Sequence, residues 1–296
     1  MIRGIPGVLL AAGLLTAAHA QTDYEIRLHR PGKAGDRYHL TAVGHDTKAS
    51  TATTEGRPPR ANRHETAVEL EGVVTLLEAD AAGVSRAEIR IERATREESG
   101  KRTELLPAGT TVTELRRGAS QAFEVKGQPL LPDTGEALGL VLSETTTEND
   151  DELFGSRARR KVGERWSVNP AGVAGLFARP SGGRRMAITP RDVTGSVRLD
   201  RVAPCGAASC MTIEVSGTIS LPAASLSPQG MQVESSAIDY AFSGLLPVDP
   251  ARPRVQESAR ITIRFRGRRP ASPDNAPMTL EATLEKRTSR SLAPLP

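Results

Sequence analysis

Residues 211–221 read MTIEVSGTISL, and this stretch decides the fold class. From Met211 to Leu221 every second position is apolar or glycine, and the positions between them are polar. Successive side chains of a β-strand point to opposite faces, so the pattern predicts a strand with one dry face and one wet face. One-sided burial is typical of antiparallel sheets, because parallel strands are usually covered on both faces.

The same two-residue period recurs along most of the chain. It is found at residues 24–28, 68–76, 87–92, 259–266 and 278–285. Gly72 lies inside one of these stretches and predicts a local bend. Together the stretches predict a mostly β protein with about ten or more antiparallel strands. We expect one large curved sheet, either a half-barrel or a sandwich.

Two short helices are expected between the strands. Asp133-Thr134-Gly135-Glu136 has the spacing of a capping box, and apolar positions follow it. Asn169-Pro170 supplies an N-cap residue followed by proline at the first helical position. The second helix should end near Ala178.

The length of 296 residues suits one large domain or two small ones. Residues 148–161 contain an acidic run and then a basic run, which predicts a solvated linker or loop. This segment would divide an N-terminal β half, 21–147, from a C-terminal β half, 162–296, although the halves could also form one continuous sheet. Residues 48–63 and 268–277 lack periodicity and are expected to be loops or disorder.

Residues 1–20 have the features of a secretory signal peptide. Arg3 precedes the apolar run Val8–Leu15, and Ala18-His19-Ala20 offers small residues at the cleavage site. We therefore expect cleavage near Ala20 and a periplasmic or secreted protein.

No later apolar stretch is long enough to span a bilayer as a helix, so an integral membrane protein is not expected. The formal charge of +4 is nearly balanced, and no nucleic-acid partner is expected.

Cys205 and Cys210 lie at the predicted tip of a hairpin. In an oxidising compartment such a pair is expected to form a structural disulfide. A redox-active pair is the alternative, but four residues separate the cysteines instead of the usual two, and none of the four is basic.

A six-residue motif occurs twice, 128 residues apart. Lys33-Ala34-Gly35-Asp36-Arg37-Tyr38 and Lys161-Val162-Gly163-Glu164-Arg165-Trp166 share the pattern Lys-x-Gly-acid-Arg-aromatic. We call these the two strand-initiation motifs, with Gly35, Asp36, Tyr38, Gly163, Glu164 and Trp166 as their key residues. The motif predicts a glycine turn that leads into a strand, used either as a common local solution or as a trace of two related halves.

These motifs, in an exported cysteine-poor chain rich in strands, resemble exported bacterial all-β families. Those families have a curved antiparallel sheet in the style of periplasmic lipoprotein carriers. The resemblance implies a curved sheet, and it transfers no catalytic residue.

No catalytic residue, metal site or cofactor is expected from motifs. The histidines after the leader are His29, His39, His45 and His64, and they have no metal-binding spacing. The chain also lacks the serine-nucleophile motifs Gly-x-Ser-x-Gly and Ser-x-x-Lys. With 35 acidic residues, a hydrolase based on paired carboxylates stays an alternative.

Two short helices would cover little of so wide a sheet. Part of its dry face is therefore expected to be open to a ligand or partner. We expect an exported, non-enzymatic envelope protein that binds or carries a lipid or another apolar or amphipathic ligand, or that binds an envelope protein. The alternatives are a periplasmic hydrolase with unidentified acidic residues and a purely structural interaction domain.

Overall fold

The computed structural model describes residues 22–30, 32–80, 83–117, 120–142, 150–178, 187–221, 231–272 and 276–295. The expected signal peptide, residues 1–20, lies outside the described residues.

The described part of the chain is dominated by strands. The first half forms β1 (Arg37–Thr54), β2 (Arg60–Asp80), β3 (Gly83–Glu98), β4 (Lys101–Glu104), β5 (Thr111–Arg117), β6 (Ser120–Val125), β7 (Gln128–Pro129) and helix α1 (Pro132–Leu142). The second half forms α2 (Asp150–Leu153), β8 (Arg165–Ser167), α3 (Pro170–Phe177), the 3-10 turn η1 (Pro190–Asp192), β9 (Val193–Cys205), β10 (Ala208–Ser220), β11 (Gln232–Pro247), β12 (Gln256–Arg269) and β13 (Met278–Pro294).

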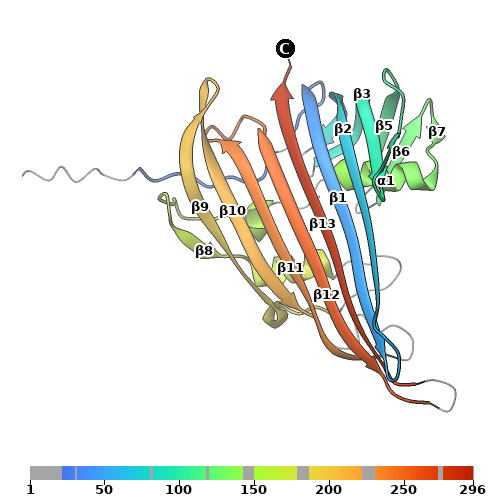
Figure 1. The fold of residues 1–296 in the computed structure, drawn as a ribbon. Coiled ribbons are helices and arrows are strands. Elements are labelled where there is room, and N and C mark those ends of the chain that lie inside the picture. The colour runs from blue at the N-terminus through green and yellow to red at the C-terminus, as the bar shows by residue number, and fades with distance from the viewer. Residues whose placement is uncertain are drawn as a thin grey trace, which may run out of the picture.

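These strands form one antiparallel sheet, as predicted. Its order is β7-β6-β5-β3-β2-β1-β13-β12-β11-β10-β9-β8, with β4 paired to β3. The sheet is open, and Figure 1 shows it as a half-barrel whose strands converge at one end and spread at the other. The first and last strands, β1 and β13, pair from Tyr38 opposite Pro294 to Thr54 opposite Met278. The two halves of the chain are therefore parts of one continuous sheet.

The expectation of a loop over residues 48–63 is wrong. Lys48–Thr54 completes β1, and Arg60–Arg63 begins β2, so only residues 55–59 connect the strands. The polar composition hid these strand ends because neither face of the hairpin end is dry. Backbone pairing with β13 and the β-branched threonines of this stretch stabilise it instead.

The strand expected over residues 24–28 is also absent. Tyr24 makes a single bridge, in which its N–H and C=O each bond to the backbone of Arg160 at 2.8 Å. Ile26 and Leu28 nevertheless point into the core and are buried. The alternation thus identified the buried side chains correctly, although no neighbouring strand pairs with this segment over its length.

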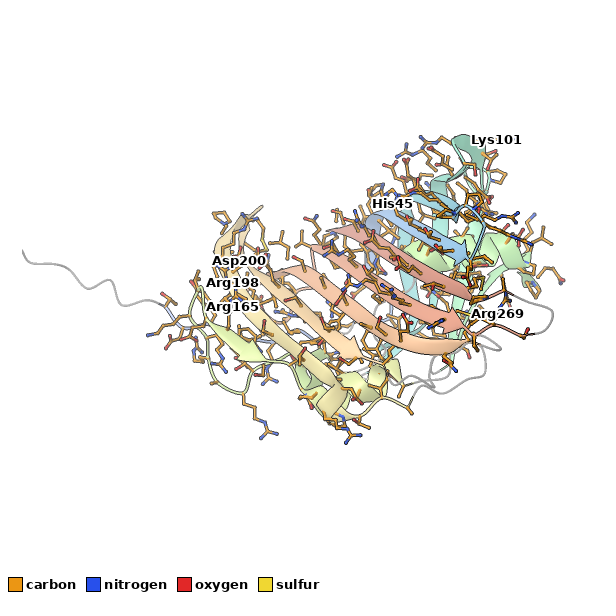
Figure 2. The ribbon with its side chains drawn as sticks, turned by 60° about the horizontal axis from the view of Figure 1, so that its bottom comes forward. His45, Lys101, Arg165, Arg198, Asp200 and Arg269 are labelled. Atoms are coloured by element: carbon orange, nitrogen blue, oxygen red, sulfur yellow. A yellow bond between two sulfur atoms is a disulfide. The ribbon has the colours of Figure 1, made fainter. Side chains whose placement is uncertain are left out.

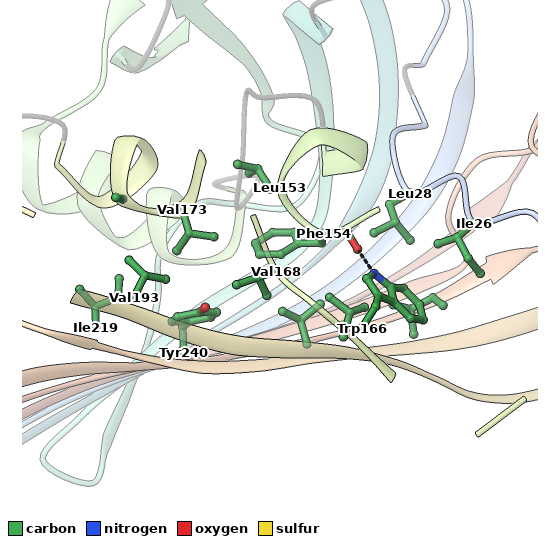
Figure 3. Packing of buried hydrophobic residues seen from close by; sticks show 14 of the residues in the cluster. Ile26, Leu28, Leu153, Phe154, Trp166, Val168, Val173, Val193, Ile219 and Tyr240 are labelled. Carbon is green, nitrogen blue, oxygen red and sulfur yellow. Dashed lines mark hydrogen bonds between the residues drawn. The ribbon is translucent and has the colours of Figure 1, made fainter. Parts of the chain in front are cut away.

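The helix-covered, inner face of the sheet carries two separate apolar cores. The first core lies under α1 and is built mainly by β1, β2 and β3, with Leu70, Ile89 and Leu138 among its fully buried side chains. The second core lies under α2 and α3 (Figure 3) and includes Phe154 and Tyr240. The helices therefore cover two separate regions of the same inner face and exclude water from each.

Helix α1 approaches the sheet closely at a glycine. A Cβ atom added to Gly44 would lie 2.7 Å from Leu140 Cγ, so a larger residue there would push α1 away from β1. The helix begins at Pro132, one residue before the expected cap Asp133. Its first turn is closed by the Gly135 N–H, which donates to the Leu131 carbonyl at 2.9 Å.

Helix α3 confirms the predicted N-cap. The Asn169 side chain accepts hydrogen bonds from the N–H groups of Ala171 and Gly172 at 3.1 and 3.2 Å, and Pro170 is the first helical residue. The capped end fixes α3 over the second core, where Val173 is fully buried.

The cysteine pair forms the expected disulfide. Cys205 and Cys210 are bonded across the β9–β10 hairpin, with Cα atoms 5.7 Å apart. Gly206 has φ +64 and supplies the left-handed backbone at the tip of the turn.

Candidate functional site

One row of inner-face residues crosses the sheet from core to core. Register pairs link Leu199, Ile213, Gly244, Glu257, Arg290, Ala42 and Leu70 in that order. The row is apolar at both ends, but its centre holds Glu257 on β12 and Arg290 on β13, whose side chains are only 15% and 9% exposed. A buried charged centre therefore separates the two cores.

This centre continues into a chain of ion pairs that we call the central ion network. It consists of Asp150, Arg254, Glu257 and Arg290. Arg254 pairs with Asp150 at the start of α2, and its Nη1 also donates to Glu257 Oε2 at 2.9 Å. Arg290 pairs with the other oxygen of Glu257. Each carboxylate thus has a guanidinium partner, which buried charges require.

The network also holds the end of α1. The carbonyl of Leu142, the last residue of α1, accepts from Arg116 Nη2 at 3.0 Å and from Arg290 Nη1 at 3.3 Å. Arg116 in turn pairs with the buried Glu114 at 2.5 Å. Cations at a helix C-terminus satisfy carbonyls that lack intrahelical donors. Arg290 therefore joins the cover of the first core to the central ion network.

Two members of the central ion network, Glu257 and Arg254, have pKa values shifted so as to favour their charged forms. Burial raises the pKa of Glu257, but Arg290 and Arg254 outweigh burial and hold that pKa below its ordinary value. Burial lowers the pKa of Arg254, and the carboxylates of Asp150 and Glu257 more than reverse this effect. Glu257 is accordingly a poor proton donor and a firm anchor for both guanidinium groups.

A cavity of about 430 Å³ lies beside the network on the first-core side. Its apolar wall is made by Tyr38, Leu40, Val74, Leu76, Ile89 and Leu292. Its floor holds the buried Glu114, Asp150 and Arg290. Lys33, Asp36, Arg37 and Arg252 also line it and are exposed, which places them at its mouth. The cavity thus has an apolar wall, an ion-paired floor and a charged mouth.

A smaller cavity of about 60 Å³ lies on the second-core side of the network. Leu28, Phe154 and Phe242 contribute to its apolar wall. It shares Asp150, Arg254 and Glu257 with the larger cavity. These three residues therefore form a partition between two cavities on the inner face.

The first strand-initiation motif lies at the mouth of the larger cavity. Gly35 has φ +92, and the Asp36 carboxylate accepts from the Lys33 N–H at 2.7 Å. The Gly35 N–H donates to the Leu76 carbonyl at 2.8 Å, and the Leu76 N–H donates to the backbone carbonyl of Asp36 at 2.9 Å. Tyr38 follows on β1 and lines the cavity.

The second motif has the same hydrogen-bond pattern at the β8 edge of the sheet, whereas the first leads into the central strand β1. Gly163 has φ +88, and the Glu164 carboxylate accepts from the Lys161 N–H at 3.1 Å. The Gly163 N–H donates to the Leu199 carbonyl at 2.7 Å, and the Leu199 N–H donates to the backbone carbonyl of Glu164 at 3.2 Å. Trp166 follows on β8, and its Nε1 donates to the Phe154 carbonyl at 2.8 Å (Figure 3). The two motifs are therefore one structural unit used twice.

Sequence reasoning missed the central ion network. The expectation of a solvated linker over residues 148–161 is wrong for α2, where Asp150 is 7% exposed and pairs with Arg254, whereas the basic stretch 157–159 is exposed and lies in a loop. A signal for Glu257 and Arg290 is nevertheless present in the sequence. Both occupy positions at which the alternation places apolar, inward-facing residues. Glu257 shares its face with Ala259 on β12, and Arg290 shares its face with Leu292 on β13. A charge at such a position indicates either a strand end or a buried ion pair.

Among the residues that the structure describes, one group of side chains could hold a metal ion. His39, Glu71 and Glu92 each offer a ligand atom, and these atoms lie within 4.8 Å of one another. A register shift between β2 and β3 lies beside Glu92, whose carboxylate is 2.9 Å from His39 Nε2. The group also has a purely ionic explanation, because Arg93 pairs with Glu71 at 3.5 Å. It lies on the outer face, away from the cavities.

The outer face is otherwise wet and ion-paired, as its alternation predicted. Figure 2 shows charged side chains spread over it, including the labelled Arg198 and Asp200, which pair at 3.2 Å. Arg266 likewise pairs with Glu281 on the neighbouring strand at 3.3 Å. Exposed pairs of this kind add little stability, and they keep this face in water.

Within the described residues, no helix has the length and apolar character needed to cross a membrane. The fold and its cavities define an open-sheet β protein with a charged partition on its inner face. No known protein family and no curated protein sequence matches the chain.

Three solved structures show low similarity. A structure of lipovitellin, described for its lipid–protein interactions, aligns with 86% of this chain and 25% of its own chain, at 9% identity and a TM-score of 0.33. A LolA superfamily protein from Nitrosomonas europaea aligns over 92% and 90%, at 11% identity and a TM-score of 0.11. The outer membrane protein OprG from Pseudomonas aeruginosa aligns over 88% and 98%, at 6% identity and a TM-score of 0.19. The chain spans about a quarter of the lipovitellin chain, and at these scores none of the three defines a family or an activity.

Proposed function

We propose that this protein binds an amphipathic ligand in the larger cavity of the inner face. The observation that carries the proposal is the 430 Å³ cavity with an apolar wall on one side and the central ion network beneath it. Ligand sites of small molecules have volumes of roughly 300 to 1,000 Å³ and combine apolar walls with a few fixed polar groups. An apolar chain would contact Leu40, Leu76 and Leu292, and a polar end would face the charged mouth.

We further propose that the protein acts without catalysis. The cavity does bring carboxylates together, which is what a glycoside hydrolase requires. A general acid, however, needs a raised pKa, whereas the pKa of Glu257 is lowered by Arg290 and Arg254. Glu114 and Asp150 are also held by arginines. The network supports a role in positioning and in partitioning the inner face.

The site of action that we propose is the periplasm or the exterior, after cleavage near Ala20. The Cys205–Cys210 disulfide supports this proposal, because such bonds persist in oxidising compartments.

The test is ligand binding by the mature protein, with residues 21–296 purified from the periplasm. We expect an apolar fluorescent probe, N-phenyl-1-naphthylamine, to bind, and single-chain amphiphiles to displace it. Leu292→Trp should fill the cavity and weaken probe binding about tenfold or more, because Leu292 lines the cavity on β13. Leu284→Trp is the matched control, since Leu284 lies on the same strand and face but outside the cavity lining.

Native mass spectrometry of the same material should show whether lipids co-purify. The proposal would be overturned if the probe failed to bind the folded wild type. It would also be overturned if Leu292→Trp and Leu284→Trp, both folded by circular dichroism, bound the probe as the wild type does.

A further inference from the structure

The charges that line the larger cavity do not balance. Seven basic and four acidic side chains line it, an excess of three positive charges. The whole sequence has a formal net charge of only +4. The floor contributes nothing to the excess, because Arg116, Arg254 and Arg290 match Glu114, Asp150 and Glu257 there. The excess therefore belongs to the upper wall and the mouth.

Arg30 supplies the half-buried part of this excess. In the described part of the chain its guanidinium donates to four backbone carbonyls, at 2.7 to 3.3 Å, and to no carboxylate. The acceptors belong to Arg27, Pro247, Asp249 and Arg252. Carbonyl dipoles satisfy the N–H donors but add no negative charge to balance the guanidinium.

The surroundings of Arg30 oppose its charge. Burial lowers the pKa of Arg30, and the nearby carboxylates of Asp151 and Asp249 compensate only in part. The positive charge of Arg254 lowers the pKa further. An anion placed in the cavity would relieve both the desolvation and the repulsion.

The mouth adds charge of the same sign. Lys33, Arg37 and Arg252 are exposed there, against the single carboxylate of Asp36 among the lining residues. Arg252 also pairs at 3.6 Å with Asp249, which lies outside the lining and reduces the excess of three positive charges to two. A cavity mouth with one prevailing sign of charge attracts ions of the opposite sign and speeds their association.

We propose that the ligand of this cavity is an anionic amphiphile. Its oxyanion head group, a carboxylate or a phosphate monoester, would lie between Arg30 and the basic mouth, and its chain would lie along Leu40, Leu76 and Leu292. This inference rests on the proposed function and adds the charge of the ligand to it. The ion-paired floor fits this arrangement, because its charges already have partners when an apolar chain covers them.

The first experiment compares ligands of one chain length on the wild-type protein. Decanoate, decyl phosphate, decanol and decylammonium would each displace N-phenyl-1-naphthylamine, an uncharged probe that favours no sign of charge. We expect both anions to bind about tenfold or more tightly than decanol, since hydrogen bonds between charged groups are stronger than those of a neutral hydroxyl. Decylammonium should bind most weakly. The tighter of the two anions identifies the head group.

The outcomes separate this inference from the proposed function. If decanol binds as tightly as both anions, the inference is wrong and the cavity still binds amphiphiles. If the probe itself fails to bind, the proposed function is wrong. Raising the salt concentration should weaken the anions and leave decanol unchanged.

The second experiment changes Arg30. Arg30→Gln should reduce the anion-to-alcohol affinity ratio about tenfold, and Arg30→Lys, which keeps the charge, should retain most of it. Arg198→Gln is the matched control, because Arg198 is a half-buried arginine on the outer face with an ion-pair partner, Asp200. An unchanged ratio in folded Arg30→Gln would overturn the assignment to Arg30. If that variant fails to fold, the ligand series on the wild type and on Arg30→Lys decides the question.

Discussion

Tyr240 occupies its place in the second core because two neighbouring residues are glycines. Gly217 pairs with Tyr240 across β10 and β11, and Gly195 pairs with Gly217 across β9 and β10. A Cβ at Gly217 or Gly195 would lie 2.2 or 2.4 Å from the Tyr240 hydroxyl. The hydroxyl donates to the Thr194 carbonyl at 3.2 Å, and burial raises the pKa of Tyr240 to about 12. These glycines provide space for the ring, which alternation alone could not show.

Gly217→Ala should destabilise the protein by about 1 to 3 kcal/mol, the usual cost of overpacking. The new methyl would also lie 2.3 Å from the Thr194 carbonyl, so the backbone itself must shift. Gly175→Ala is the control, because no atom lies within 4 Å of its Cβ position in α3. That change should stabilise by roughly 0.5 to 1 kcal/mol. Urea unfolding measures both, and equal effects of the two variants would contradict the packing argument.

The carboxylate of Glu257 makes the free energy of unfolding depend on pH. Its pKa is lowered by folding, so its contribution is complete above the unfolded-state value of 4.5 and is lost as the pH falls through the lower folded-state value. Glu257→Gln removes one partner of two arginines and should cost about 3 kcal/mol at pH 7. The difference from wild type should shrink below about pH 4.

Urea midpoints at pH 7 and pH 3.5 check this expectation. Glu281→Gln provides the control, since Glu281 is exposed and its pair with Arg266 at 3.3 Å is worth at most about 1 kcal/mol. A cost for Glu257→Gln that stays constant between the two pH values would show that the charge of Glu257 is not its source.

At the scale of elements, periodicity located the strands better than their ends. β10, β12 and β13 follow the alternating stretches, because a half-buried strand must repeat every two residues. The end of β1 at Thr54 escaped prediction because its hairpin is polar on both faces. α2 escaped because four residues are too few to show a helical period. Local pattern therefore predicted elements wherever water and core lie on opposite faces.

The disulfide contributes a small, local stabilisation to the β9–β10 hairpin. Its ring closes only six residues, for which chain entropy predicts about 2 kcal/mol. Cys205→Ser and Cys210→Ser should each destabilise by that amount, and the double variant should add nothing further. Adding a reductant should lower the wild type to the level of the variants and leave the variants unchanged. Thermal unfolding gives these values, and non-reducing peptide mapping should show Cys205 joined to Cys210.

At the scale of the whole molecule, two features depend on contacts distant in sequence. The seam between β1 and β13 joins the two ends of the chain, and no local pattern specifies that pairing. The central ion network likewise joins Asp150, Arg254 and Arg290 from three separate segments. The wide sheet and its open inner face were predictable from alternation, whereas the cavity and its charges follow from this topology.

The seam predicts that both cores unfold together. Trp166 is the only tryptophan and reports on the second core. Tyr38→Trp in a Trp166→Phe background would report on the first core from the equivalent position of the other motif.

Because β1 and β13 pair along their whole length and Arg290 links α1 to the network, loss of either core exposes an unpaired central strand. The two fluorescence transitions in urea should coincide within error. Separate midpoints would instead show two independent domains. The fragments 21–147 and 162–296 provide a second check. Each should fold alone if the domains are independent, and both should aggregate if they share one sheet.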